Sequence, residues 1–495
     1  MKKPIRITAI LLALAFCLTT IGAAVNPLSY PKLKAWNPTT GAPLAGGKLY
    51  SFYPGGETPK NTYSDSGLTT ANKNPVILDV YGEADVYLNG STKLVLKTSA
   101  DISVWTMDSV TTPNDYFIDA AAYGSNQAGI EAAKTAIGSN NRTLNLSAAT
   151  WAITGDMTIP SNITLRMDQG AVLAISTGKT VTINGPLDAG PYQIFSCTST
   201  RQVNFGPGAI AEAYPEWWGA RADNSTDSLS GIQAAVNTGV KVVLAKGTYK
   251  LSGTLTFTAL GALVPATGII EGAGWQHTVL EFSNTTTPGI WIDYDNTVMA
   301  TLNIKGMYIC GPGGSSSGNI GISVPGGTDK SISSLIIENV LVSNWGGDGV
   351  FISANTGPVQ LRDLYVFNTG GNGITITAHA VHGNPQDVTI TGGAIQGAIT
   401  GAALYVDGGT RTICGLSVYE VDIELPATSS KPCIYLRNVY GPVFHGVTAS
   451  SWAKLSVLGD ALVYLDDGVS GATFTNLYTH LSHQVMAHRY LMIFR

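Results

Sequence analysis

The chain has 495 residues, of which 12% are charged, and its formal net charge is −5. This mildly acidic composition excludes the basic stripe of a nucleic-acid-binding protein, and the length exceeds one compact domain unless the chain is a repeat array. Glycine is abundant at 57 residues. Together with many Thr, Ser, Asn, Val and Ile, it indicates an all-β protein of the extracellular type.

Residues 1–24 have the pattern of a secretory signal peptide. A basic start, "MKKPIR", precedes the apolar stretch "ITAILLALAFCLTTIG" and the small residues Gly22-Ala23-Ala24. This pattern predicts export through the Sec route and removal of the segment, so the mature protein is expected to be secreted or on the cell surface, periplasm included. No later stretch is long and apolar enough to insert into a membrane.

Residues 28–112 are expected to form a small β domain. Its segments include "GGKLYSFYPGG", "NPVILDVYGEADVYLNG" and "KLVLKTSADISVW". These motifs resemble the small β domain at the front of phage tailspikes and tail fibres, which implies attachment and leaves a homotrimer open. A phage structural protein assembles in the cytoplasm and needs no signal peptide. We therefore expect an exported protein built from the same modules.

The central part of the chain repeats itself. "LIIENVLVSNWGGDGVFI" (335–352) overlies "VQLRDLYVFNTGGNGITI" (359–376) at an offset of 24 residues. Each copy holds three short stretches of alternating apolar residues, which is the period of strands. Such a unit cannot bury its inner face alone and must stack on its neighbours. The pattern predicts a parallel β-helix, right-handed by the rule for parallel crossovers.

Between the first two strands of each repeat, the apolar spacing grows to three residues, so the chain must bend there. The second residue of this step is mostly Gly, Asn or Asp, which tolerate the left-handed backbone that such a corner needs. The aligned set is Gly306, Asn339, Asp363, Asp387, Glu420 and Asn476. Asp348, aligned with Asn372 and Gln396, can be a catalytic acid or a turn residue, and its partners favour the turn.

A longer repeat relates residues 128–159 to residues 230–257. Each copy begins with an Ala-rich amphipathic helix, which can cover the open end of a β-helix. The expected organisation is a first β-helical module at 118–212 and a second at 213–480. The tail 481–495 is expected to be irregular, and two interpretations stay open: a truncated last rung, or a metal site of His480, His483 and His488.

The start of the second module carries a family resemblance. Gly219-Ala220, Asp223, Asp227 and Gly247-Thr248-Tyr249 match the opening motifs of the pectate-lyase-like, rhamnogalacturonase/epimerase-like β-helix superfamily. The resemblance covers about 213–480 and implies a right-handed parallel β-helix with a polysaccharide partner. The polygalacturonase motifs "NTD", "GHG" and "RIK" are not assembled here, so that family's catalytic residues do not transfer.

Function is expected on the outward residues of the strand after the bend. The predicted outward pairs are Leu341/Ser343, Tyr365/Phe367, Thr389/Thr391 and Asp422/Glu424. Asp422 and Glu424 lie about 6.6 Å apart at strand rise, which suits an inverting glycosidase with Glu424 as acid and Asp422 as base. Tyr365 and Phe367, about 10 Å away, offer faces on which sugars stack. A solvated acidic strand is the alternative.

A lyase would use a base and often calcium, for which Asp293 and Asp295 supply few ligands. No cofactor is expected for hydrolysis, and calcium is expected only for a lyase. Cys414 and Cys433 can form a bridge in an oxidising compartment, or all mature cysteines can be small buried residues. The sequence thus predicts a polysaccharide-binding and polysaccharide-degrading β-helix, with a non-catalytic adhesin or tailspike-like structural protein as the alternative.

Overall fold

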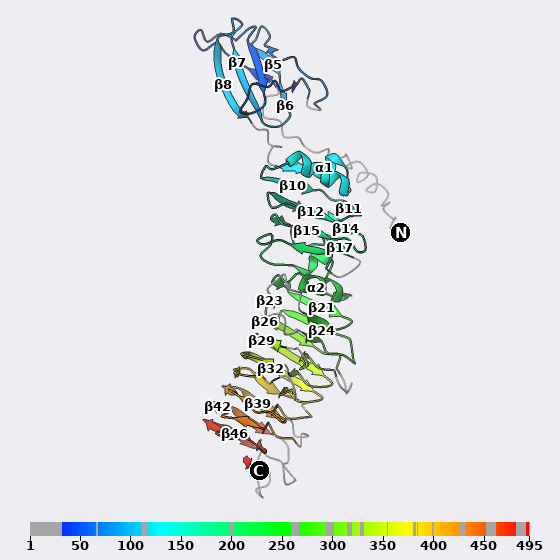
Figure 1. The fold of residues 1–495 in the computed structure, drawn as a ribbon, viewed down its shortest axis with the longest axis vertical. Coiled ribbons are helices and arrows are strands. Elements are labelled where there is room, and N and C mark those ends of the chain that lie inside the picture. The colour runs from blue at the N-terminus through cyan, green and yellow to red at the C-terminus, as the bar shows by residue number, and fades with distance from the viewer. Residues whose placement is uncertain are drawn as a thin grey trace, which may run out of the picture. The chain divides into compact units, whose positions relative to one another are not determined.

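A computed structural model describes residues 32–65, 68–110, 117–197, 201–258, 267–293, 301–313, 319–326, 331–353, 355–379, 383, 385–397, 400–425, 431–451, 462–481 and 492–494. The predicted signal peptide lies outside the described residues. The chain divides into two compact units, Met1–Phe117 and Ile118–Arg495, each of which is described by itself (Figure 1).

The first unit is a small antiparallel β structure. Its main sheet has the order β4 (Val76–Ile77), β2 (Lys48–Phe52), β7 (Thr92–Lys97) and β8 (Ser103–Val110). Two pairs complete it: β1 (Lys32–Lys34) with β5 (Glu83–Asp85), and β3 (Thr62–Tyr63) with β6 (Tyr87–Leu88). Leu49, Leu94 and Leu96 alternate inward into a core of their own, so the residues between them face outward.

The second unit opens with a helix that covers the first rung. In α1 (Gln127–Ile137), Ile130, Ala133 and Ile137 share one face and are fully buried in the core of the coil. The side chain of Asn126 caps α1 by accepting a hydrogen bond from the Gly129 N–H. The helix therefore shields the apolar end of the coil from water.

The strand β9 (Phe117–Asp119) and the short 3₁₀ helix η2 (Ala120–Tyr123) precede α1, and three short parallel sheets follow it. Their strands are β10 (Arg142–Leu146), β13 (Ile163–Met167) and β16 (Leu187–Asp188); β11 (Thr150–Ile153), β14 (Val172–Ile175) and β17 (Phe195–Cys197); β12 (Met157–Ile159), β15 (Val181–Ile183) and β18 (Val203–Phe205). Each sheet takes one strand from every rung, so the chain winds as a three-sided coil.

A second stretch of coil begins after η3 (Pro215–Trp218), and α2 (Leu229–Val236) follows its first strand. Its first sheet contains β19 (Asp223–Asp227), β20 (Val242–Val243), β21 (Gly247–Leu251), β23 (Thr267–Glu271), β24 (Thr278–Phe282), β26 (Thr301–Cys310), β29 (Ser334–Trp345), β32 (Val359–Thr369), β34 (Val388–Thr391), β35 (Ala394–Gln396), β38 (Ser417–Tyr419), β39 (Asp422–Leu425), β42 (Val443–His445), β43 (Thr448–Ser451), β45 (Thr473–Thr475) and β46 (Tyr478–Leu481).

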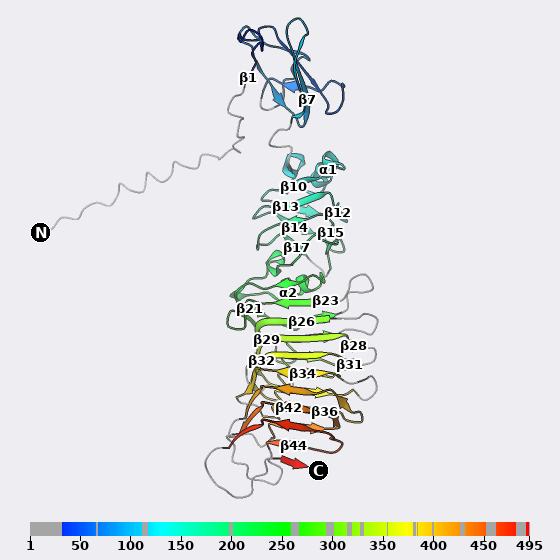
Figure 2. The same cartoon turned by 90° about the vertical axis from the view of Figure 1, so that its left-hand side faces the viewer.

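The other long sheet contains β22 (Leu255–Thr258), β25 (Ile290–Asp293), β27 (Ile322–Val324), β30 (Val350–Ile352), β33 (Ile374–Thr377), β36 (Leu404–Asp407), β40 (Ile434–Arg437), β44 (Val463–Leu465) and β47 (Met492–Phe494). Two parallel pairs join neighbouring loops: β28 (Ser331–Ile332) with β31 (Asn355–Thr356), and β37 (Ile413–Cys414) with β41 (Val439–Tyr440). The stacked rungs are visible in Figure 2. The predicted right-handed parallel β-helix is confirmed.

One apolar core runs through both stretches of coil, from Ala120 to Leu465. Because this core is shared, α2 lies between two stacks of rungs and does not close a free end (Figure 1). The inward residues predicted from the repeat are buried. Leu335, Ile337, Val340 and Val342 are all 0% exposed.

The predicted bend is a left-handed corner. All six aligned residues have positive φ, from 47° at Asp363 to 68° at Gly306. One placement was wrong, however. Asp387 lies before β34, and the residue that follows Asp363 in this column is Gly392, with φ of 66°; Gly393, with φ of 79°, lies opposite Leu364. An insertion between β33 and β34 lengthens this rung, because Val359 pairs with Val388 at an offset of 29 residues, where Leu335 pairs with Val359 at 24.

Asp348 has a structural role that links two turns. Its carboxylate accepts hydrogen bonds from the Asn372 N–H and the Thr375 hydroxyl, both at 2.7 Å. Asn372 repeats the arrangement one rung on by accepting from the Ala402 N–H at 2.8 Å. Ala402, and not Gln396 as expected, follows Asn372 in this column, because the same insertion and one further residue before β36 lengthen the rung. Burial raises the pKa of Asp348, and its two hydrogen bonds oppose that shift.

The corner can be tested by exchanging glycine and larger residues. At Gly306 an added Cβ would lie 2.6 Å from the Gly272 carbonyl oxygen, so we expect Gly306→Ala to lower the free energy of unfolding by at least about 1–2 kcal/mol. Glu420→Gly relieves a left-handed residue with φ of 54° and should raise it by up to about 1 kcal/mol. Chemical denaturation measures both, and equal effects of the two changes would contradict the assigned corner.

Asp348 is tested by comparing two substitutions. Asp348→Ala leaves the half-buried Asn372 N–H and the buried Thr375 hydroxyl without their acceptor, so the free energy of unfolding should fall by about 1–3 kcal/mol. Asp348→Asn keeps an acceptor oxygen and should cost less than about 1 kcal/mol. The midpoint of urea unfolding distinguishes them. Equal losses would mean that the hydrogen bonds between turns contribute nothing.

Candidate functional site

The strands after the corner present two outward columns of side chains. The first column is Val279, Tyr308, Leu341, Tyr365, Ala394, Asp422 and Thr448, and the second is Glu281, Cys310, Ser343, Phe367, Gln396, Glu424 and Ser450. We call this surface the post-corner face. The insertion before β34 moves Thr389 and Thr391 ahead of the corner, where they pair with Gln360 and Arg362, so their predicted place is taken by Ala394 and Gln396.

The register brings the four residues singled out from the sequence onto this face. Tyr365 pairs with Ala394, and Ala394 pairs with Asp422, so Tyr365 and Asp422 lie two strands apart. Two strands correspond to about 10 Å. In β39, Ile423 and Leu425 are fully buried, which directs Asp422 and Glu424 outward as half-buried side chains.

The surroundings of Asp422 act on its pKa in opposite directions. Burial raises its pKa, the neighbouring negative charge of Glu424 adds to this rise, and a hydrogen bond from Gln396 opposes it. The Gln396 Nε2 donates to Asp422 Oδ2 at 2.5 Å. A carboxyl with a raised pKa holds its proton to higher pH, as a general acid must. The geometry therefore favours Asp422 as the acid, the reverse of the assignment made from the sequence.

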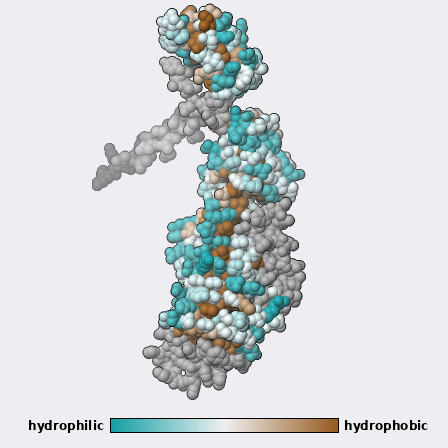
Figure 3. Space-filling view, turned by 60° about the vertical axis from the view of Figure 1, so that its left-hand side comes forward, coloured by the Kyte–Doolittle hydropathy of each residue, from teal (hydrophilic) through white to brown (hydrophobic). Residues whose placement is uncertain are grey.

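Aromatic side chains lie on the same face as the acids, two or more strands away from them. The ring of Trp275, from the segment after β23, contacts Tyr365 at 5.6 Å between centroids and is tilted by 42°. Tyr308 shares a hydrogen bond of 2.7 Å with Ser343, and burial raises its pKa to about 12. Phe367 is half-buried in the neighbouring column. Figure 3 shows apolar residues among hydrophilic ones on one side of the coil.

A second cluster, which the sequence analysis missed, lies on the sheet that contains β36, β40 and β44. Tyr405, Tyr435 and Tyr464 stack with centroids 4.7 and 5.5 Å apart and planes within 6° of parallel. Its signal in the sequence is the recurring pattern "LYVD", "IYLR" and "VYLD" at spacings of 30 and 29 residues. This pattern was not recognised because its spacing differs from 24.

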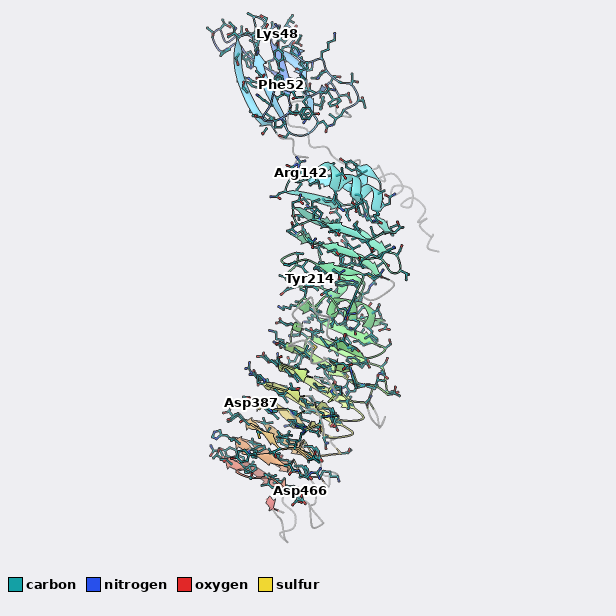
Figure 4. The ribbon with its side chains drawn as sticks, in the orientation of Figure 1. Lys48, Phe52, Arg142, Tyr214, Asp387 and Asp466 are labelled. Carbon is teal, nitrogen blue, oxygen red and sulfur yellow. The ribbon has the colours of Figure 1, made fainter. Side chains whose placement is uncertain are left out.

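The polar groups of this cluster bond one another. Arg437 donates from Nε and Nη2 to the two carboxylate oxygens of Asp407, at 2.8 and 2.5 Å. The hydroxyl of Tyr435 donates to Asp466 at 2.7 Å, which is labelled in Figure 4. Burial alone would raise the pKa of Asp407, but hydrogen bonds from Arg437 and its neighbours outweigh burial and lower it. These hydrogen bonds link side chains of three successive rungs, so the main role of the cluster is to stabilise the fold.

Other residues considered for chemistry lie apart from one another. Asp293 ends β25, while Asp295, His483 and His488 lie outside the described residues. Within the described ranges no three His, Cys, Asp or Glu side chains gather closely enough to hold a metal ion. Cys433 is buried and Cys414 is exposed, and the two are not bonded to each other. The described part of the chain has no helix long and apolar enough to cross a membrane.

The fold defines a right-handed parallel β-helix protein preceded by a small antiparallel β unit. No family model and no curated protein sequence matches the chain. Among solved structures, ORF18 of Geobacillus virus E2 is similar at 16% identity and a TM-score of 0.41, over 55% of this chain and 62% of that protein. The chain thus spans less than two thirds of that relative.

Two enzymes are similar at lower scores. The glycan biofilm modifying enzyme WceF of Pantoea stewartii, described with a bacteriophage tailspike-like parallel β-helix fold, is 12% identical over 90% of this chain and 63% of its own length, with a TM-score of 0.36. The A-module of the mannuronan C-5 epimerase AlgE4 of Azotobacter vinelandii is 13% identical over 56% of this chain and 99% of its own length, with a TM-score of 0.26. The β-helical assignment itself rests on the strand register.

The raised pKa of Asp422 predicts how stability changes with pH. The folded state binds the Asp422 proton more tightly than the unfolded state, whose pKa is about 3.9. That stabilisation is complete below the unfolded pKa and is lost as pH rises through the folded pKa. We therefore expect Asp422→Asn to gain stability relative to the wild type as pH rises, measured by urea unfolding at several pH values.

Asp223 provides a control of opposite sign. Hydrogen bonds from the backbone and hydroxyl of Thr226, and from the Ser225 N–H, lower the pKa of Asp223. Its stabilisation is present above the unfolded pKa and is lost as pH falls, so Asp223→Asn should lose stability relative to the wild type as pH rises. The same pH trend for both variants would contradict the environment described for Asp422.

Proposed function

We propose that the chain is an exported protein that binds a polysaccharide along the post-corner face and hydrolyses it at Asp422 and Glu424. The observation that carries this proposal is the half-buried carboxylate pair, in which Asp422 has a raised pKa and a fixed amide partner, Gln396. Tyr365 and Phe367 lie two strands away in register with it. The signal-peptide pattern of residues 1–24 supports export.

In the proposed reaction, Asp422 donates its proton to the glycosidic oxygen as the bond to the anomeric carbon breaks. Glu424 takes a proton from a water molecule, which attacks that carbon from the opposite face, so the configuration inverts. Gln396 holds the Asp422 carboxyl by its hydrogen bond and limits its rotation. The Phe367 ring provides an apolar surface for a sugar further along the chain.

The backbone separation of the acids supports inversion over retention. Residues two apart on a strand have backbones about 6.6 Å apart, and carboxyl groups that keep this separation fall in the range of about 6.5–9.5 Å that leaves room for the attacking water. Retaining enzymes place their carboxyl groups at about 5–5.5 Å. A lyase reaction is the alternative chemistry, and a display protein without catalysis is the alternative class.

The test is incubation of the purified mature chain with a panel of neutral and acidic polysaccharides. We expect new reducing ends without unsaturated uronate, and a loss of about 10²–10⁴-fold in rate for Asp422→Asn or Glu424→Gln, the usual contribution of a general acid or base. Glu281→Gln is the matched control, because Glu281 lies in the same outward column as Glu424 but five strands away.

Other outcomes separate the alternatives. Unsaturated product would contradict hydrolysis and identify a lyase. Cleavage at an unchanged rate in both variants would contradict the site. Binding without any cleavage across the panel would contradict catalysis and favour the display protein.

A further inference from the structure

We propose that the outer face of the main sheet in the first unit binds an acidic polysaccharide. This face consists of Lys48, Tyr50 and Phe52 on β2 and Lys93 and Lys97 on β7; Lys48 and Phe52 are labelled in Figure 4. The inference is independent of the reaction proposed at Asp422 and Glu424, which lie in the other unit.

These side chains face outward because the strands alternate. Leu49 and Ser51 on β2 are buried, as are Leu94 and Leu96 on β7, so the residues between them lie on the opposite side of the sheet. The antiparallel register sets Phe52 opposite Lys93 and Lys48 opposite Lys97. Aromatic rings and lysines therefore share one surface, with all five side chains half-buried.

The rings and ammonium groups are close to one another. Tyr50 and Phe52 lie parallel within 1°, with centroids 6.3 Å apart. The Nζ of Lys97 is 5.0 Å from the centre of the Tyr50 ring, and the Nζ of Lys93 is 5.9 Å from that of Phe52. Cation–π contacts of this kind hold flexible lysines in place at exposed sites, which lowers the entropy cost of binding an anion there.

The face has an excess of positive charge. Lys48 forms an ion pair with Asp101 at 2.6 Å. The hydrogen bond from Lys48 lowers the pKa of Asp101, and the positive charge of Lys97 adds to this effect. Lys93 bonds to a neutral partner, the Gly56 carbonyl, at 3.1 Å. A second carboxylate, Asp108, accepts from the Gly55 N–H. The Nζ of Lys60 lies 5.5 Å from the Tyr53 ring centre. Counting Lys60, the charged groups are four lysines (Lys48, Lys60, Lys93 and Lys97) and two aspartates (Asp101 and Asp108).

An acidic polysaccharide fits this surface better than a nucleic acid does. Single-stranded nucleic acids bind through open aromatic faces on which bases stack, whereas the Tyr50 and Phe52 faces already carry lysine ammonium groups. Duplex DNA has one charge per about 1.7 Å, which is a denser line of charge than separate lysines on two strands can match. A polyuronate has sparser carboxylates, which match separate lysines, and apolar C–H faces, which match the ring edges.

The experiment measures binding of the full chain to polygalacturonate, neutral dextran and oligothymidylate at low ionic strength. The Asp422→Asn/Glu424→Gln background is used throughout, so that no polymer is consumed. We expect Lys93→Gln/Lys97→Gln to weaken polygalacturonate binding by about fivefold, the loss of two exposed charge contacts, and to leave dextran binding unchanged. The difference should shrink at high salt, which screens exposed charges.

The matched control is Lys32→Gln/Lys73→Gln, which removes two exposed lysines of the same unit that lie outside β2 and β7. It should leave polygalacturonate binding unchanged, and Lys93→Arg/Lys97→Arg should retain it. Equal binding by the Lys93→Gln/Lys97→Gln variant and its background would overturn the proposal, as would an equal loss in the control. Tighter binding of oligothymidylate than of polygalacturonate would overturn the assigned ligand.

Discussion

The candidate site depends on the left-handed corner between the first two strands of each rung. At this corner one residue with positive φ turns the chain sharply and leaves the strand on either side in register with the rungs above and below. The inward set Val340 and Val342 and the outward set Leu341 and Ser343 are thereby fixed. A slip of one residue would exchange the two sets and would bury the carboxylates of Asp422 and Glu424 in an apolar core.

Much of the fold was predictable because burial and backbone conformation leave local marks in the sequence. The repeat identified the inward residues, and Gly, Asn and Asp identified most of the corner residues by their tolerance of left-handed backbone. Glu420 was placed by alignment, although its type gives no such signal. The position of Asp422 two strands from Tyr365 was also predicted, since it requires only that the rungs stack.

The rest depended on loop lengths, which apolar periodicity does not record. The insertion between β33 and β34 adds residues outside the core without disturbing inward alternation, so Thr389 and Thr391 were assigned to the wrong side of the corner. The same insertion hid the place of Gln396 beside Asp422. Without the contact to Gln396 and the burial of Asp422, the residue types alone offer no basis for choosing which of the two carboxyl groups is the acid. The tyrosine stack was missed for a related reason, its spacing of about 30 residues.

The two polar clusters of the coil differ in how their charges are compensated. Asp407 is held ionised by a bidentate arginine, and its pKa falls despite burial. Burial and the neighbouring carboxylate of Glu424 raise the pKa of Asp422, and the hydrogen bond from Gln396 opposes them. A lowered pKa stabilises the charged form and suits a structural ion pair, whereas a raised pKa keeps a proton available for transfer. This contrast is why the proposed chemistry is assigned to the post-corner face.

The measurement that tests the central claim most directly is the anomeric configuration of the first product, followed by proton NMR during cleavage of a polysaccharide that the chain accepts. The account predicts that the first-formed reducing end has the configuration opposite to that of the bond cleaved, because the water attacks with Glu424 as base and Asp422 as acid. Retention of configuration would contradict the paired-acid geometry, and an unsaturated product end would contradict hydrolysis altogether.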